Sequence, residues 1–153
     1  GVSFTAETYQ LLSQHPNING VKEASGNFSL LSHTRALCGD DFHIWSGNDD
    51  QVVPMMSLGA KGVVSVAANL VPEVMVQMSH LCLEGRFREA AALQIEYTDL
   101  IDALFLEVNP IPIKTALNLA VYEVGSLRLP LCAMSDGHLE TLRRAMESAQ
   151  LLQ

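Results

Sequence analysis

The stretch Gly62-Val63-Val64-Ser65-Val66-Ala67 is almost wholly apolar and rich in β-branched residues. A run of this length and composition is typical of a strand buried on both faces, as in parallel sheets. Two shorter apolar runs precede it and predict strands over residues 18–22 and 42–46. Helical patterns lie before and between these strands, over residues 5–14, 29–37 and 50–58, with Thr5 as the expected N-cap of the first and Gly39 as the stop of the second. Strands and helices that alternate at roughly 20-residue spacings predict βαβ units and an α/β fold.

After residue 69 the pattern is helical only, with helices predicted over residues 72–84, 86–105, 112–124 and 138–152. The first predicted helix has no strand before it, although in a right-handed parallel array such a helix crosses back from a preceding strand. A TIM (β/α)8 barrel needs about 250 residues. The 153 residues therefore predict a partial barrel over residues 1–84 that starts in mid-domain, followed by a C-terminal helical region over residues 85–153.

Composition excludes several classes of function. The formal net charge of −8 argues against nucleic acid or an anionic membrane as a partner. No stretch is long and apolar enough to predict a membrane span. The cysteines at 38, 82 and 132 are far apart and odd in number, which predicts reduced thiols and a cytoplasmic protein. The five histidines show no metal-ligand spacing, so no metal site is predicted.

Lys22 is the residue most suggestive of chemistry. It is one of three lysines in the chain and ends the first predicted strand. Strand alternation places it on the same face as Gly20, which leaves room beside a long side chain. Partial burial disfavours the charged form of an amine, and a neutral amine can attack a carbonyl to form a Schiff base. The alternative is a structural lysine that reaches from a strand end to solvent.

Gly47 follows the second predicted strand and is a candidate for bringing the backbone close to a ligand, although an ordinary turn glycine fits the pattern equally well. Asp49 and Asp50 are candidate acid–base groups, but a role at a helix N-terminus is favoured for them. Val64 lies in the third strand, where packing in the core is the default interpretation.

Four segments of the chain together resemble the dihydrodipicolinate synthase family. Residues 20–27, Gly-Val-Lys-Glu-Ala-Ser-Gly-Asn, resemble its Schiff-base lysine segment. Residues 46–49, Ser-Gly-Asn-Asp, resemble its turn after the next strand, and residues 62–69 resemble its last barrel strand. Asn-Pro-Ile-Pro-Ile-Lys at 109–114 and Leu-Arg-Leu-Pro-Leu at 127–131 resemble its C-terminal helical part. The wider superfamily of pyruvate-dependent class I aldolases includes N-acetylneuraminate lyases, and the last two segments resemble the synthase family more.

The resemblance implies that residues 1–84 are the C-terminal half of a barrel, with its last three strands. It implies a lyase of lysine and diaminopimelate biosynthesis in which Lys22 forms an imine with pyruvate. The resulting enamine attacks L-aspartate-4-semialdehyde to give 4-hydroxy-tetrahydrodipicolinate. Gly47 and Val64 match positions that line the pyruvate pocket. No metal and no organic cofactor are implied, because the imine itself withdraws the electrons.

The family's Tyr-Asn-x-Pro segment, threonine pair, relay tyrosines and semialdehyde-binding arginine match nothing in this chain and would precede Gly1. The isolated chain is therefore expected to be inactive or weakly active. The family resemblance further implies a homo-oligomer, a tetramer in the full enzyme, with Phe28 and Leu58 as interface candidates and core burial as the alternative.

Two other functions stay open. The chain fits a non-catalytic half-barrel that assembles with a complementing N-terminal half or with itself, because its first strand would otherwise expose unpaired backbone groups. It also fits a related pyruvate aldolase with another aldehyde substrate.

Overall fold

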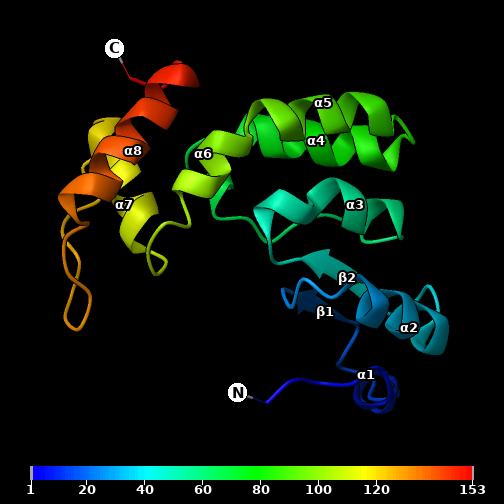
Figure 1. The fold of residues 1–153 in the computed structure, drawn as a ribbon. Helices are drawn as coiled ribbons and strands as arrows, with labels where there is room; N and C mark the ends of the chain where they lie inside the picture. The colour runs from blue at the N-terminus through cyan, green and yellow to red at the C-terminus, as the bar shows by residue number, and fades with distance from the viewer. Residues whose placement is uncertain (1, 153) are drawn as a thin grey trace.

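The computed structural model describes residues 2–152; residues 1 and 153, the outer limits of the two predicted regions, lie outside it. The first part alternates helix and strand (Figure 1), as α1 (Ala6–Ser13), β1 (Gly20–Glu23), α2 (Phe28–Cys38), β2 (His43–Ser46), η1 (Asp49–Gln51), α3 (Val52–Ser57) and η2 (Ala67–Asn69). The second part is helical, with α4 (Pro72–Leu83), α5 (Phe87–Glu96), α6 (Thr98–Ala103), α7 (Ile111–Leu119) and α8 (Asp136–Ser148).

The two strands pair in parallel, as the sequence predicts. Gly20 lies opposite His43 and Lys22 lies opposite Trp45. The third predicted strand is shorter than expected. Its ladder consists of a bridge between Val63 and Ser46, with hydrogen bonds from Ser46 N to Gly62 O at 2.9 Å and from Val64 N to Ser46 O at 2.8 Å. The strand ends after Val64 because the backbone N–H groups of Val66 and Ala67 donate to the Asp49 side chain.

Helix starts follow the predicted capping chemistry. The Thr5 hydroxyl accepts from Thr8 N at 3.3 Å, which confirms Thr5 as the N-cap of α1. Asn27 Oδ1 accepts from Leu30 N at 3.0 Å and caps α2 in the same way. Both side chains satisfy a backbone donor that has no partner inside the helix.

The single helix predicted over residues 86–105 is two helices, α5 and α6, with a break at Tyr97. The Thr98 hydroxyl donates to Gln94 O at 2.8 Å at this break. The same kind of bond from Ser79 and Thr141 leaves α4 and α8 continuous, so nothing in the structure explains the break. The helix predicted over residues 112–124 also ends early, at Leu119. Its continuation turns back through Val121 and Glu123, which both have positive φ angles.

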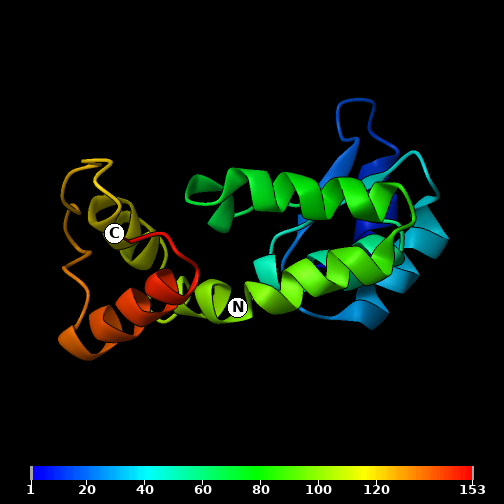
Figure 2. The same ribbon diagram turned by 90° about the horizontal axis from the view of Figure 1, so that it is seen from above.

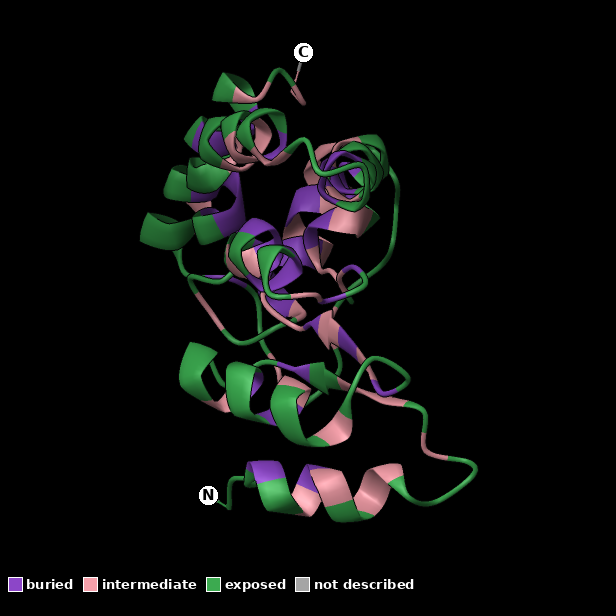
Figure 3. Cartoon of the chain, turned by 90° about the vertical axis from the view of Figure 1, so that its right-hand side faces the viewer, coloured by how far each residue is buried: buried purple, intermediate pink, exposed green. Residues whose placement is uncertain are grey.

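One buried cluster runs from the sheet into the helical region. It contains Leu31, Ile44 and Val52 in the first part, and Leu104 and Met146 in the second. Figure 3 shows these buried residues concentrated on the inner faces of the helices. Met55, Met56, Met75 and Met78 belong to the cluster, as their helical spacing predicts. The division at residue 84 stays a prediction.

In the second part, α4 packs against α5, and α8 packs against both α6 and α7 (Figure 2). Over residues 2–152, no helix combines the length and the hydropathy that a membrane crossing requires.

Candidate active site

One face of the sheet carries all of the predicted site residues. In a parallel ladder, paired residues point to the same side, so Lys22 and Trp45 share a face while Val21 and Ile44 share the other. Ile44 is 1% exposed and packs in the core against the helices. The face of Lys22 is therefore the one turned away from the helices, which is the interior side in a (β/α)8 barrel.

Lys22 itself is exposed in the described chain. The partly buried amine expected from the sequence is not what the structure presents. The space beside Gly20, which was expected to accommodate Lys22, is occupied by β2 instead. A Cβ at Gly20 would lie 2.2 Å from His43 O and 2.7 Å from Trp45 Cζ3. Because Lys22 lies on the exposed face of the sheet, no opposite wall within residues 2–152 excludes water from it.

Gly47 packs directly against the aliphatic stem of Lys22. A Cβ at Gly47 would lie 2.9 Å from Lys22 Cε and 2.6 Å from Ala24 Cβ, closer than real Cβ contacts allow. The Gly47 N–H donates to Glu23 O at 2.7 Å and continues the ladder past the strand ends. The glycine is thus required for close approach to Lys22, which an ordinary turn glycine would not be. Its role in binding a ligand stays a prediction.

Val64 lies on the same face. Its preceding residue, Val63, pairs with the buried Ser46 and packs on the core, so alternation turns Val64 towards the side of Lys22. Val64 is 48% exposed, which contradicts its default interpretation as core. The structure therefore brings Lys22, Gly47 and Val64 together at the carboxyl ends of three successive parallel segments.

Glu23 is a buried group that the sequence analysis missed. It is 6% exposed and points to the helix side, opposite Lys22. Its Oε1 accepts from Ser25 N at 2.6 Å and its Oε2 accepts from the Tyr9 hydroxyl at 3.2 Å. A buried carboxylate is costly unless it is hydrogen-bonded. These bonds anchor the turn after Lys22 to α1. A charged residue on the apolar face of a strand was the sequence feature that could have indicated this buried carboxylate.

The contact between Tyr9 and Glu23 predicts an alkaline effect on stability. Burial raises the pKa of Tyr9 above its ordinary value of 10.0, and the charge of Glu23 and its hydrogen bond raise this pKa further. A raised folded-state pKa means that the contribution to stability is complete below about pH 10 and is lost as the pH rises through the folded-state pKa. We expect Glu23→Gln to lower the pKa of Tyr9 in an ultraviolet titration, with Tyr9→Phe identifying the transition. An unchanged Tyr9 transition in Glu23→Gln would contradict the contact.

Asp49 also has a structural partner that the sequence did not indicate. It is 1% exposed, and its Oδ2 accepts from Val66 N at 2.9 Å and from Ala67 N at 2.8 Å. Asp49 and Asp50 lie in the first turn of η1, which confirms their predicted place at a helix N-terminus, and the Asp49 carboxylate in addition bonds the start of η2. These bonds end the third strand and hold the Val64 segment beside the loop that carries Gly47.

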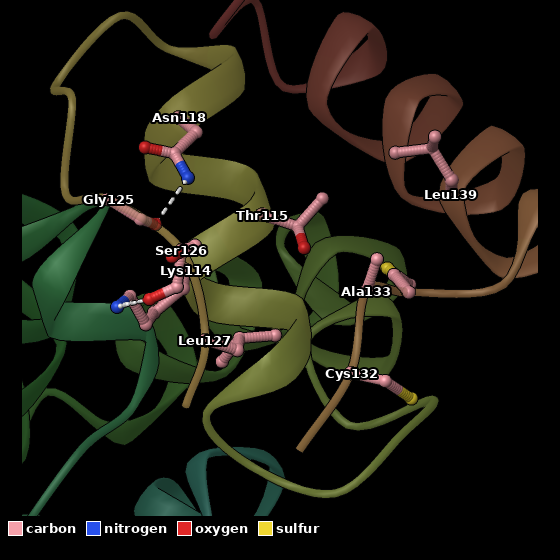
Figure 4. Close-up of a pocket in the computed structure, with 10 residues that line it drawn as sticks. Lys114, Thr115, Asn118, Gly125, Ser126, Leu127, Cys132, Ala133 and Leu139 are labelled. Atoms are coloured by element: carbon pink, nitrogen blue, oxygen red, sulfur yellow. Dashed lines mark hydrogen bonds between the residues drawn. The ribbon is translucent and has the colours of Figure 1, made fainter. Parts of the chain in front are cut away.

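A separate cavity of about 290 Å³ lies in the C-terminal helical region between α7, the following loop and α8 (Figure 4). Its lining is mostly apolar and includes Leu127, Met134 and Leu139. The Lys114 ammonium donates to Ser126 O at 2.7 Å and Asn118 Nδ2 donates to Gly125 O at 3.0 Å, so both polar groups bind the loop. The cavity shares no residue with the site around Lys22. Over residues 2–152, no group of three His, Cys, Asp or Glu side chains is placed to hold a metal ion.

Parallel segments with helices on one face, and a lysine and a close-packed glycine at their carboxyl ends on the other, define part of a (β/α)8 barrel. The dihydrodipicolinate synthetase family matches residues 1–149. The chain belongs to this family, which confirms the resemblance seen in the sequence.

Individual relatives agree. The chain is 49% identical to a 4-hydroxy-tetrahydrodipicolinate synthase of Clostridium novyi over 148 residues, which are 97% of this chain and 50% of the relative. A crystal structure of the synthase from Cyanidioschyzon merolae with lysine bound has a TM-score of 0.95 and 40% identity, and the match covers 99% of this chain and 52% of that one. A synthase from Acinetobacter baumannii complexed with pyruvate has a TM-score of 0.91 and 30% identity over 97% of this chain and 51% of its own. The chain spans about half the length of the relatives it matches.

Proposed function

We propose that this chain is the C-terminal half of a lyase that condenses pyruvate with L-aspartate-4-semialdehyde to 4-hydroxy-tetrahydrodipicolinate, with Lys22 as the covalent residue. The observation that carries the proposal is the placement of Lys22 at the carboxyl end of β1 with Gly47 packed against its stem. Family membership and the relative described as complexed with pyruvate support the choice of substrate.

The proposed reaction needs only the amine and its surroundings. The Lys22 amine attacks C2 of pyruvate and the carbonyl oxygen leaves as water, which gives a cationic imine. The imine withdraws electrons, so a proton leaves the methyl carbon and an enamine forms. The enamine carbon then bonds to the aldehyde carbon of the semialdehyde. The semialdehyde amine finally attacks the imine carbon, releases Lys22 and closes the ring. No metal and no organic cofactor takes part in this scheme.

The exposure of Lys22 supports a second part of the proposal. Imine chemistry requires a site from which water is excluded, so the site needs a wall opposite β1 and β2. We propose that an N-terminal half-barrel supplies this wall and the groups that move protons. The chain alone is then inactive or weakly active. We place the completed enzyme in the cytoplasm. A half-barrel that closes through a partner or a second copy is the alternative that the exposed face supports.

The test is borohydride trapping with pyruvate on a chimera that joins the N-terminal half of the Clostridium novyi synthase to this chain. We expect one pyruvate adduct, found by peptide mapping on the segment that contains Lys22. The chain alone should give little or no adduct. Absence of an adduct on a folded chimera would overturn the proposal, and product analysis with a panel of aldehydes would decide the second substrate.

Assembly as a homo-oligomer is part of the proposal. Phe28 is 36% exposed and Leu58 is 42% exposed, so neither is a core residue of this chain. Both lie at helices next to the site, Phe28 at the start of α2 and Leu58 at the end of α3. Large apolar side chains left at the surface favour an interface between subunits.

A further inference from the structure

The loop between β2 and α3 is the part of the site that depends most on contacts from elsewhere in the chain. It places Gly47 against Lys22, and its Asn48 side chain donates to Ala24 O at 3.2 Å. These contacts hold the start of the loop to β1. The end of the loop leads into η1 and α3, where neither N-cap side chain, Asn48 or Gln51, accepts a hydrogen bond from the first turn of its own helix. Backbone groups at this junction therefore need partners from another element.

Gln94 supplies those partners from α5. Its Oε1 accepts from Val53 N at 2.9 Å, in the first turn of α3, and its Nε2 donates to Asp50 O. One amide thus satisfies a donor and an acceptor on opposite sides of the junction, from a position 41 and 44 residues further along the chain. Among the described residues, both of the long-range side-chain hydrogen bonds between the two predicted regions come from Gln94.

The amide group suits this junction and other side chains of similar size do not. An amide has both an acceptor oxygen and a donor nitrogen, while methionine has no donor and an ionised glutamate has only acceptors. Leaving a backbone group without its partner at a partly buried junction costs about one hydrogen bond, roughly a tenfold change in an opening equilibrium.

We infer that Gln94 is a positioning residue through which the C-terminal helical region holds the Gly47 loop against Lys22. It touches no reacting atom. Its effect on catalysis rests on the proposed function, while its effect on the loop does not. The C-terminal helical region thus supports the site around Lys22, although the cavity beside α7 and α8 is separate from that site.

Amide hydrogen exchange on the full 153-residue chain tests the inference without any substrate. We expect Gln94→Met to speed exchange at Gly47 and Val53 by about tenfold, with α8 amides such as Leu142 unchanged. Gln77→Ala is the control, because Gln77 is exposed on the neighbouring helix α4 and its side chain makes no hydrogen bond among the described residues. Unchanged exchange in the loop, or an equal increase across the whole chain, would overturn the inference.

Gln94→Glu provides a rescue that a packing role would not show. A protonated carboxyl has one donor and one acceptor, like the amide, whereas the ionised form faces the Asp50 carbonyl with a like partial charge. The ionised carboxylate keeps the acceptor for Val53 N and loses the donor to Asp50 O. Protection factors at Gly47 should therefore be low at neutral pH in Gln94→Glu and should recover below about pH 4, where glutamate is protonated. Gln94→Met should show no recovery over the same range, and equal behaviour of the two variants would overturn the inference.

The catalytic consequence is measured on the chimera. Gln94→Met should slow pyruvate trapping on Lys22 by about tenfold relative to Gln77→Ala. If the unsubstituted chimera traps no pyruvate, the proposed function fails, and the exchange measurements still decide the role of Gln94.

Discussion

Replacing Lys22 with alanine is expected to abolish the borohydride-dependent attachment of pyruvate to the completed barrel. Only a primary amine can form the imine that borohydride reduces, and Lys22 alone among the three lysines stands at a strand carboxyl end. Residual attachment should fall to the level of a control without borohydride. Intact-mass analysis after trapping measures the loss directly.

The other two lysines are matched controls. Lys61 precedes the third strand at its amino end, where its backbone N–H donates to Ile44 O at 2.8 Å. Lys114 uses its ammonium to bind the loop after α7. Lys61→Ala and Lys114→Ala should therefore keep full trapping. An adduct that survives in Lys22→Ala and moves to either of these residues would show that the nucleophile has been assigned wrongly.

Replacing Gly20 with alanine should cause a large loss of stability, because the added methyl group has no space between the paired strands. The added Cβ would lie 2.2 Å from the His43 carbonyl oxygen and 2.7 Å from the Trp45 ring. The first of these atoms is backbone in the paired strand and cannot rotate away. Overpacking of this kind costs about 1–3 kcal/mol and sometimes more, and we expect about 3 kcal/mol in the free energy of unfolding from urea denaturation.

Gly137→Ala is the control for the change of residue type. Gly137 lies in the first turn of α8, and a Cβ there would have no heavy atom within 4 Å. Alanine in a helix is more stable than glycine by roughly 0.5–1 kcal/mol, so this variant should unfold at the same or a higher urea concentration. Equal stability of Gly20→Ala and the unsubstituted chain would mean that β1 and β2 are not paired in the observed register.

Patterns that extend over a few residues were predicted well. Apolar spacing predicted both strands, a capping side chain predicted the start of α1 at Thr5, and a glycine predicted the end of α2 at Gly39. All three signals act within about one helical turn. The errors lie where a distant group competes for the same backbone. The third strand stops early because the Asp49 carboxylate takes the N–H groups of Val66 and Ala67. One error has no such cause: the break at Tyr97 within residues 86–105 has no structural explanation.

The sequence by itself determined the α/β class, the family and the candidate lysine, because periodicity and short motifs are properties of neighbouring residues. Only the tertiary structure decided which side chains support that lysine. Glu23 with Tyr9, Asp49 with Val66, and Gln94 with Val53 are joined across 14, 17 and 41 residues. The tertiary structure also decided that Lys22 is exposed. Burial depends on which distant segments pack around a residue, and a local sequence pattern does not contain that information.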